Sequence, residues 1–225
     1  MKIPKIPHRW NVSPCAAIAI QRRLASQISC RADPGPFRFI AGIDCAFSAD
    51  GKNCIAGVVL WDAQEKCVIE EAVAMRPLRF PYVPGLLSFR EAPAILAALR
   101  KLRGGPDALM CDGQGFAHPR RVGIACHVGL LANKPTVGCA KSRLCGEHAE
   151  PPRARGSRAE LFHRGEIVGS VLRTQDGVNP VYVSVGHRLD QETAEQIVLA
   201  CATKYRLPEP TRLADQLVAR IKRAG

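Results

Sequence analysis

Hydrophobic and polar residues alternate with two different periods along the chain, and this divides the first third into elements. Residues 13–29 have apolar side chains at helical spacing, so we expect a helix that ends at the following Pro- and Gly-containing stretch. Residues 37–47 alternate with period two, as in a strand. The apolar face of that strand comprises Phe39, Ala41, Ile43, Cys45 and Phe47. Two more β-rich runs, 54–62 and 66–75, follow the hairpin signal Asp50-Gly51, which predicts an antiparallel three-stranded meander.

In the second half, helices alternate with short buried strands. The pattern predicts a helix over 90–102, a strand over 108–112, a helix over 118–133 and a strand over 136–141. Later elements are a hairpin around Arg164-Gly165, a strand over 180–186 and helices over 191–205 and 211–222. A meander that leads into strand–helix–strand crossovers predicts a mixed α/β sheet, an antiparallel three-stranded meander plus parallel strands, with helices on its faces.

The chain shows no internal repeat and no domain linker, so we expect a single domain over residues 1–225. Residues 147–158 are rich in Pro, Arg and Gly and predict an exposed, mobile basic loop.

Charge changes this picture more than overall composition does. Lys and Arg number 32 against 20 Asp and Glu, a net charge of +12. Such a surplus favours polyanions, because each contact to a phosphate releases a condensed counterion. A basic surface without a nucleic-acid role is about equally compatible with the charge alone.

The ten cysteines form no C-x-x-C pair and no spacing typical of zinc. Cys45, Cys111 and Cys139 lie in apolar runs, where a thiol packs as a small hydrophobe. There is no signal-peptide pattern after Met1 and no apolar run of membrane-spanning length. We therefore expect a reduced, cytoplasmic protein that does not associate with membranes.

Three carboxylates stand out. Asp44 lies in the middle of an apolar strand, where a charge is costly unless it is paired or bound to a cation; the alternative is a sheet edge facing solvent. Asp112 ends a buried strand, where ligands of α/β sheets collect, although Asp also caps turns. Glu91 completes an S-x-x-E capping box with Ser88, the role that this segment alone favours; a helix that starts at Pro93 would instead free Glu91.

Three carboxylates from different elements suit Mg²⁺, a hard cation that keeps waters for substrate phosphates. Two such ions can clamp the attacking and leaving oxygens of a phosphoryl transfer. In a basic protein, this combination favours a nuclease over a phosphatase of small molecules.

For the other candidates, residue chemistry alone favours a structural role over a functional one. Lys141 closes a strand beside Asp112 and could contact a scissile phosphate, or be a solvated lysine. His118, predicted at a helix start, could contact a phosphate or be structural. The aromatic and proline-rich 81–85 loop could separate bases, or be a buried connector.

Several stretches, taken together, resemble the endonuclease V family. They are IAGIDCAF, PYVPGLLSFRE, DGQGFAHPRRVGIACHVGLL, KPTVGCAKSRLCG, YVSVGHR and YRLPEPTRLAD, from about Ile40 to Asp215. The resemblance implies a ribonuclease H-like fold, whose element order agrees with the one above. It also implies Mg²⁺ dependence, with Mn²⁺ as a substitute, and hydrolysis of the second phosphodiester bond 3′ to a hypoxanthine base.

The resemblance also implies roles for individual residues. Asp44, Glu91, Asp112 and, in the final motif, Asp215 correspond to metal ligands, and Lys141 to an active-site lysine. A strand-separating wedge would be formed by Pro81, Tyr82, Val83 and Pro84. The segments that line the base pocket or phosphate path contain Gly85, Leu87, Gly113, His118 and Gly123. Val83 replaces a common Ile, and Gln114 replaces His or Asn in the D-G-x-G turn; neither is a metal ligand.

The resulting hypothesis is a monomeric DNA-repair endonuclease for deoxyinosine that leaves 3′-hydroxyl and 5′-phosphate ends. An inosine-specific endoribonuclease of the same fold, a non-catalytic inosine-binding protein and a general structure-specific nuclease stay open as alternatives.

Overall fold

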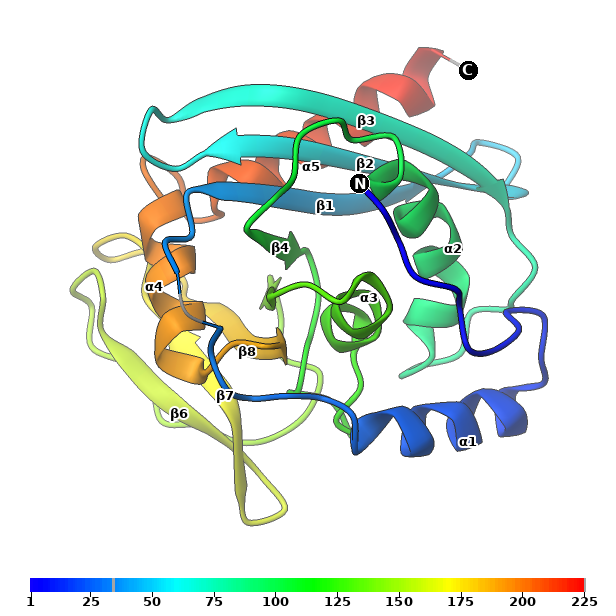
Figure 1. The fold of residues 1–225 in the computed structure, drawn as a ribbon. Coiled ribbons are helices and arrows are strands. Elements are labelled where there is room, and N and C mark those ends of the chain that lie inside the picture. The colour runs from blue at the N-terminus through cyan, green and yellow to red at the C-terminus, as the bar shows by residue number, and fades with distance from the viewer. Residues whose placement is uncertain (34, 225) are drawn as a thin grey trace.

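The computed structural model describes residues 1–33 and 35–224, and within them eight strands form one sheet. Their order across the sheet is β3-β2-β1-β4-β5-β8-β7-β6 (Figure 1). The strands are β1 (Phe39–Phe47), β2 (Asn53–Asp62), β3 (Cys67–Pro77), β4 (Ala108–Cys111), β5 (Thr136–Ala140), β6 (Arg158–His163), β7 (Glu166–Leu172) and β8 (Val181–His187). The helices are α1 (Pro14–Ala25), α2 (Leu87–Leu99), α3 (Ile124–Ala132), α4 (Gln191–Cys201) and α5 (Glu209–Ala224).

The pairing of the strands confirms the predicted mixed sheet. β1, β2 and β3 form the antiparallel meander, and β1 pairs in parallel with β4, as β4 does with β5. β8 then pairs antiparallel with β5 and leads through β7 to the edge strand β6. The carboxyl ends of β4 and β5 therefore lie side by side in the middle of the sheet.

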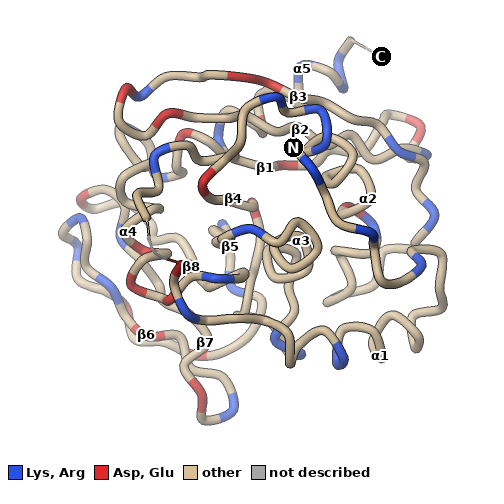
Figure 2. Tube along the Cα trace, in the orientation of Figure 1, with Lys and Arg blue, Asp and Glu red and all other residues tan. Residues whose placement is uncertain are grey.

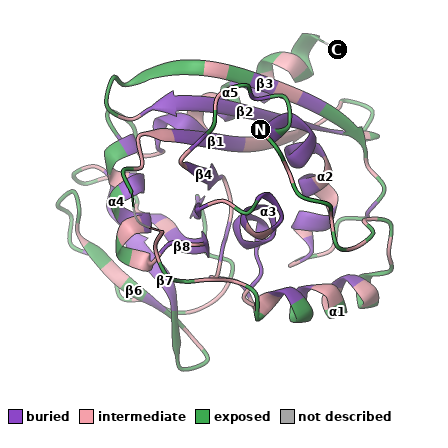
Figure 3. Ribbon diagram, viewed as in Figure 1, coloured by how far each residue is buried: buried purple, intermediate pink, exposed green. Residues whose placement is uncertain are grey.

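Helices cover both faces of the sheet. On one face, α2 and α3 pack on the side chains of Ala41 and Ile43, the apolar face predicted for β1. On the other face, α4 packs over β5 and β8, and α5 over β1 and β2. The central strands and α3 are buried, while the outer surfaces of α1 and β6 are exposed (Figure 3).

Two glycines let α5 lie directly on the meander. A Cβ atom added to Gly42 would stand 2.1 Å from the carbonyl carbon of Pro210, and one on Gly57 would stand 2.7 Å from a methyl carbon of Val218. Any larger residue at Gly42 would push the backbone of α5 away from the sheet. This close approach carries Asp215, on the second turn of α5, over the strand that holds Asp44.

The predicted starts of two helices are wrong. α2 begins at Leu87 and contains Pro93, and its first residue has no side-chain cap, so Ser88 and Glu91 do not form a capping box. Ser88 instead meets His127, with 2.8 Å between its Oγ and Nδ1 of the ring. Nearly all of α2 is buried, so tertiary packing decides where the helix starts.

The second wrong start is that of α3, which begins at Ile124 rather than at His118. Arg121 has a left-handed backbone (φ 60°), and its N–H donates to the carbonyl of His118, which closes a turn before the helix. His118 is therefore not at a helix N-terminus.

The loop over residues 147–158 is exposed from Arg153 to Gly156, as predicted. The buried guanidinium of Arg173 donates to the carbonyls of Pro151 and Pro152. Mobility of this loop stays a prediction.

All ten cysteines are free thiols. Cys111 and Cys139 are buried as predicted, whereas Cys45 is only partly buried. Within the described residues, no helix combines the length and apolar character needed to cross a membrane.

Candidate active site

Asp44 lies on the middle strand β1, between β2 and β4, so it does not face solvent at a sheet edge. Asp44 lies two residues after Gly42 in the strand, so the two residues share a face of the sheet, the one covered by α5. Burial, together with the nearby charge of Asp112 and a hydrogen bond with Asp215, raises the pKa of Asp44 to about 8. An acid held in this state is strongly disfavoured as an anion unless a cation accompanies it.

Asp112 and Lys141 directly follow the parallel strands β4 and β5, and the alignment of these strands brings their side chains together. The ammonium group of Lys141 donates to Asp112 Oδ2 at 2.5 Å and lies 4.0 Å from Asp215 Oδ1. Partial burial lowers the pKa of Lys141, but the three neighbouring aspartates outweigh this effect and raise it. Lys141 is therefore positively charged at neutral pH, and its side chain, 43% exposed, lies beside these carboxylates.

Glu91 reaches the same region from α2, on the opposite face of the sheet. Its side chain is only 9% exposed. Burial raises the pKa of Glu91 to about 7, and Asp112 adds to the rise, while Arg90 opposes it. The structure therefore brings Glu91 near Asp112, although Glu91 neither completes a capping box nor precedes a helix that starts at Pro93.

The predicted acids are thus neighbours, and we call Asp44, Glu91, Asp112 and Asp215 the carboxylate cluster. Four carboxyl groups supply oxygen donors here, and burial together with mutual repulsion raises the pKa values of Asp44 and Glu91, an effect that a divalent cation would relieve. Among the described residues, no three His, Cys, Asp or Glu side chains stand ready to coordinate a metal ion as placed. The donor chemistry fits Mg²⁺, with Lys141 at present occupying one oxygen of Asp112.

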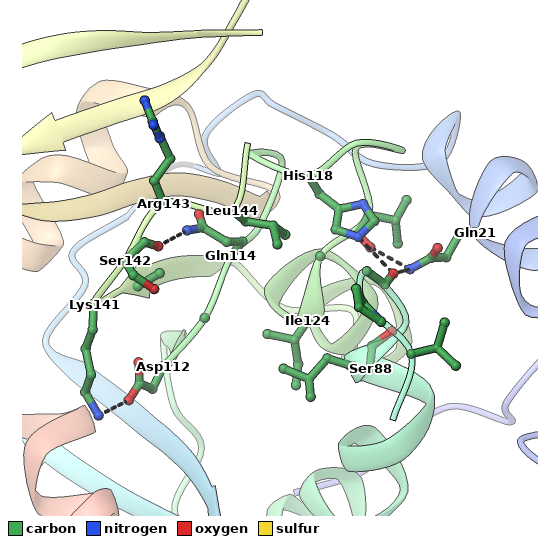
Figure 4. A pocket seen from close by; sticks show the side chains of 18 of the residues that line it. Gln21, Ser88, Asp112, Gln114, His118, Ile124, Lys141, Ser142, Arg143 and Leu144 are labelled. Carbon is green, nitrogen blue, oxygen red and sulfur yellow. Dashed lines mark hydrogen bonds and ion pairs between the residues drawn. The ribbon is translucent and has the colours of Figure 1, made fainter. Parts of the chain in front are cut away.

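A cavity of about 350 Å³ opens beside the carboxylate cluster, within the range typical of ligand sites (Figure 4). Asp112 and Lys141 border it at one end. Its wall includes most of the residues predicted for substrate binding: Tyr82, Val83, Pro84, Gly85, Leu87, Gly113, His118 and Gly123. Pro81 does not line the cavity, although it belongs to the same loop.

His118 is buried at the far end of this cavity, away from Lys141 (Figure 4). Its Nδ1 accepts from the N–H of Arg120, so Nε2 carries the proton and donates to the carbonyl of Gly85 at 2.9 Å. Burial lowers the pKa of His118 to about 4, which makes it a neutral donor near neutral pH. This arrangement gives His118 a structural contact in the wall of the pocket.

Some residues of the site were missed from the sequence. These are Gln21, Ser88, Ser142, Arg143 and Leu144, which line the cavity together with Gln114, the residue noted in the D-G-x-G turn. Gln114 donates through Nε2 to the carbonyl of Ser142, while its buried Oε1 has no partner among the described residues. Gln21 could have been noticed, because it shares a helical stripe with Ala17 and Leu24 and would therefore be buried.

A mixed α/β sheet with acidic side chains gathered over its central strands, in a basic chain, is the arrangement expected of a phosphodiester-cleaving nuclease. A family model described as Endonuclease V matches residues 22–216. The Endonuclease V of Roseiflexus castenholzii is 54% identical over 217 residues, which cover 96% of each chain. The chain belongs to the endonuclease V family, and it is an enzyme that acts on phosphodiester bonds.

Solved structures agree with this assignment. The crystal structure of Endonuclease V from Streptomyces avermitilis matches with a TM-score of 0.92 at 42% identity, covering 97% of each chain. That of Ciona intestinalis Endonuclease V, in complex with a 24mer DNA containing an inosine followed by a ribo-adenosine, matches with a TM-score of 0.80 at 25% identity, covering 94% of this chain and 98% of that one. The predicted ribonuclease H-like fold is confirmed.

Proposed function

We propose that this protein is a Mg²⁺-dependent endonuclease that recognises deoxyinosine in DNA. It hydrolyses the second phosphodiester bond 3′ to the lesion, leaves 3′-hydroxyl and 5′-phosphate ends, and serves DNA repair. The observation that carries the proposal is that the carboxylate cluster adjoins the cavity. Asp112, a member of the cluster, and Lys141, which binds Asp112, both line the cavity. The inosine-containing DNA in the complex of the Ciona intestinalis relative supports the choice of base.

In this proposal the carboxylate cluster holds Mg²⁺, or Mn²⁺ in its place. When bound, the ion supplies an activated water and stabilises the charge on the leaving oxygen. Asp44 and Asp112, from neighbouring strands, provide the rigid part of the site, and Glu91 and Asp215 approach it from opposite faces. Lys141, once it leaves Asp112, is placed to hold the scissile phosphate by its charge.

The 81–85 loop is the element proposed to open the duplex. Tyr82 is 70% exposed at its tip, unlike most aromatic side chains, and the neighbouring prolines restrict its backbone. An exposed, rigidly held ring can take the place of a base in the stack. The flipped base then enters the cavity behind the loop, whose walls are rich in glycine backbone and apolar side chains.

Lys and Arg residues are spread over loops and helices around the molecule and supply sequence-independent attraction for the phosphate backbone (Figure 2). We further propose that the enzyme acts as a monomer in the cytoplasm.

A nicking assay on end-labelled 30-mers tests the proposal. One set of duplexes contains inosine, a second contains adenine at the same position, a third contains a mismatch without inosine, and a fourth is RNA containing inosine. We expect Mg²⁺-dependent cleavage of the first set, one nucleotide beyond the inosine's own 3′ bond, and none after chelation of the metal. Equal cutting of the mismatch would identify a structure-specific nuclease, and preference for the RNA would identify an endoribonuclease.

A further inference from the structure

Gln21 is a buried polar residue on a helix that otherwise docks through apolar side chains. It lies on α1, between Ala17 and Leu24, and is 1% exposed. Burial of a carboxamide is costly unless its hydrogen-bonding groups are satisfied. Those of Gln21 are satisfied: Nε2 donates to the carbonyls of Gly85 and Val122, each at 3.0 Å, and Oε1 accepts from Nε of Arg120 at 2.6 Å.

The carbonyl oxygen of Gly85 is the centre of this network. It accepts from Gln21 at 3.0 Å and from His118 at 2.9 Å (Figure 4). It also accepts from Nη2 of Arg120 at 2.7 Å. A carbonyl oxygen has two lone pairs, so three side-chain donors around it are more than an ordinary connector needs. They come from α1 and from the turn before α3, and they fix the peptide from separate directions.

The conformation of Gly85 shows that this arrangement is specific. Its φ of 76° lies in the left-handed region, which favours glycine. A Cβ atom there would also stand 2.8 Å from Nη2 of Arg120 and 3.3 Å from Nε2 of His118. A side chain at position 85 would therefore both strain the backbone and collide with the donors that bind the Gly85 carbonyl.

Gly85 ends the 81–85 loop, so its orientation sets the direction of the chain that carries Tyr82. The prolines at positions 81 and 84 restrict the backbone between them, and a rotation at Gly85 would displace the whole loop. Val83 and Pro84 wall the cavity next to Gly85.

We propose that Gln21 is a positioning residue for recognition of the extruded base: through the Gly85 carbonyl, it holds the 81–85 loop in the orientation that opens the duplex and forms the pocket wall. The inference rests on the proposed function, which supplies the base. Gln21 lies one residue before the stretch that matches the family model. Its contribution is separate from the docking of α1, which Leu24 supports through Val122 and Cys126.

Three variants separate positioning from docking. Gln21→Leu removes all three hydrogen bonds while keeping a side chain of similar size. Gln21→Glu retains an acceptor for Arg120 but has no donor for Gly85 or Val122. Leu24→Ala is the matched control, because it weakens the docking of α1 and leaves the donors on Gly85 in place.

Two measurements are made on each full-length variant. The first is Kd and single-turnover rate on an inosine-containing duplex and on the same strand without its complement. We expect Gln21→Leu and Gln21→Glu to weaken duplex binding by about 10- to 100-fold, the penalty of a misplaced contact group, and to affect the single strand much less. The single-turnover rate at saturation should fall by less than about threefold, because the lost interaction acts on binding rather than on the chemical step.

The second measurement is hydrogen exchange of the Tyr82, Val83, Gly85 and Leu86 amides in the free protein, of which Leu86 donates to the carbonyl of Val83. Both Gln21 variants should speed this exchange at least about tenfold relative to wild type, and Leu24→Ala should not. Unchanged exchange in both Gln21 variants, or equal duplex effects in Leu24→Ala and Gln21→Leu, would overturn the proposal. If wild type fails to nick inosine substrates, the proposed function fails, while the exchange data still decide whether Gln21 orders the loop.

Discussion

The carboxylate cluster and the network around Gly85 lie at opposite ends of one cavity, and they are built on opposite principles. In the cluster, like charges are held together and burial raises the pKa of Asp44 and of Glu91. Around Gly85, each buried donor has an acceptor, and His118 is kept neutral. The fully ionised form of the first region is disfavoured without a divalent cation, whereas the buried donors of the second region already have their acceptors.

This difference indicates a division of labour. Buried carboxylates this close together are ionised only at an electrostatic cost, which a proton or a bound cation relieves, and this suits a metal site for chemistry. A fully hydrogen-bonded network holds its shape before the substrate arrives, which suits recognition of a base. The comparison predicts that changes in the cluster remove chemistry and raise stability, and that changes around the 81–85 loop weaken binding.

The largest effect is expected from the cluster. Asp44→Asn should lower nicking of an inosine duplex by about 10³-fold or more, since it removes a ligand from the group that stabilises the transition state. Above about pH 8, where Asp44 of the wild type is ionised, the same change should raise the melting temperature of the metal-free protein, because a neutral amide does not repel Asp112. Single-turnover assays and thermal melts in chelator measure both.

Asp50→Asn is the matched control, since Asp50 is an exposed aspartate in the turn after the same strand. It should change neither quantity substantially. Nicking by Asp44→Asn at the wild-type rate would show that the cluster is not the catalytic centre.

The next effect concerns the 81–85 loop. Tyr82→Ala should weaken binding of an inosine duplex by roughly 5- to 150-fold, the range for loss of an aromatic ring that stacks on a base. Binding of the unpaired inosine strand should weaken less, because no duplex has to be opened. Competition gel shifts on the two substrates measure the ratio.

Tyr205→Ala is the corresponding control, because Tyr205 is another exposed tyrosine and lies outside the cavity lining. Equal losses on duplex and single strand in Tyr82→Ala would remove the loop from strand separation.

A smaller effect is expected from pH. The pKa values of Asp44, about 8, and Glu91, about 7, lie above those of unfolded carboxyls, near 4. Such groups stabilise the fold at low pH and lose that contribution as pH rises through their folded pKa values. The metal-free protein should therefore melt at lower temperature as pH rises from 5 to 9, and the gain on adding Mg²⁺ should be larger at pH 8.5 than at pH 6.

Scanning calorimetry with chelator or with Mg²⁺ across this range measures the trend, and Asp44→Asn should flatten it. A Mg²⁺ gain that is independent of pH would contradict protonated carboxyls in the free cluster.

The sheet and part of the cluster followed from local sequence patterns. Alternation in β1 and the short apolar runs of β4 and β5 placed Asp44, Asp112 and Lys141 on neighbouring strands, because strand ends in parallel pairs must align. Asp215 depended on the resemblance, since an acid on an amphipathic helix has no distinctive local pattern. The close approach of α5 that brings it to Asp44 depends on the pairing of Gly42 with Pro210, a contact between distant segments.

Helix starts and the Gly85 network could not be read in this way. Packing along the whole of α2, rather than the capping pattern at Ser88, determines where that helix starts. The turn at Arg121 places the start of α3 after His118. A buried Gln21 is visible in the stripe with Ala17 and Leu24, but its partners lie 64 and 101 residues away. Nothing local to α1 identifies them.

The division of labour between the two regions is tested most directly by the inosine selectivity of the Asp44→Asn protein, measured as the ratio of Kd values for adenine- and inosine-containing duplexes. We predict that this protein keeps the wild-type ratio to within about threefold while nicking is lost, since sites without shared partners combine to within about 0.5 kcal/mol. Loss of selectivity together with nicking would contradict the account, because base recognition would then depend on the carboxylates themselves.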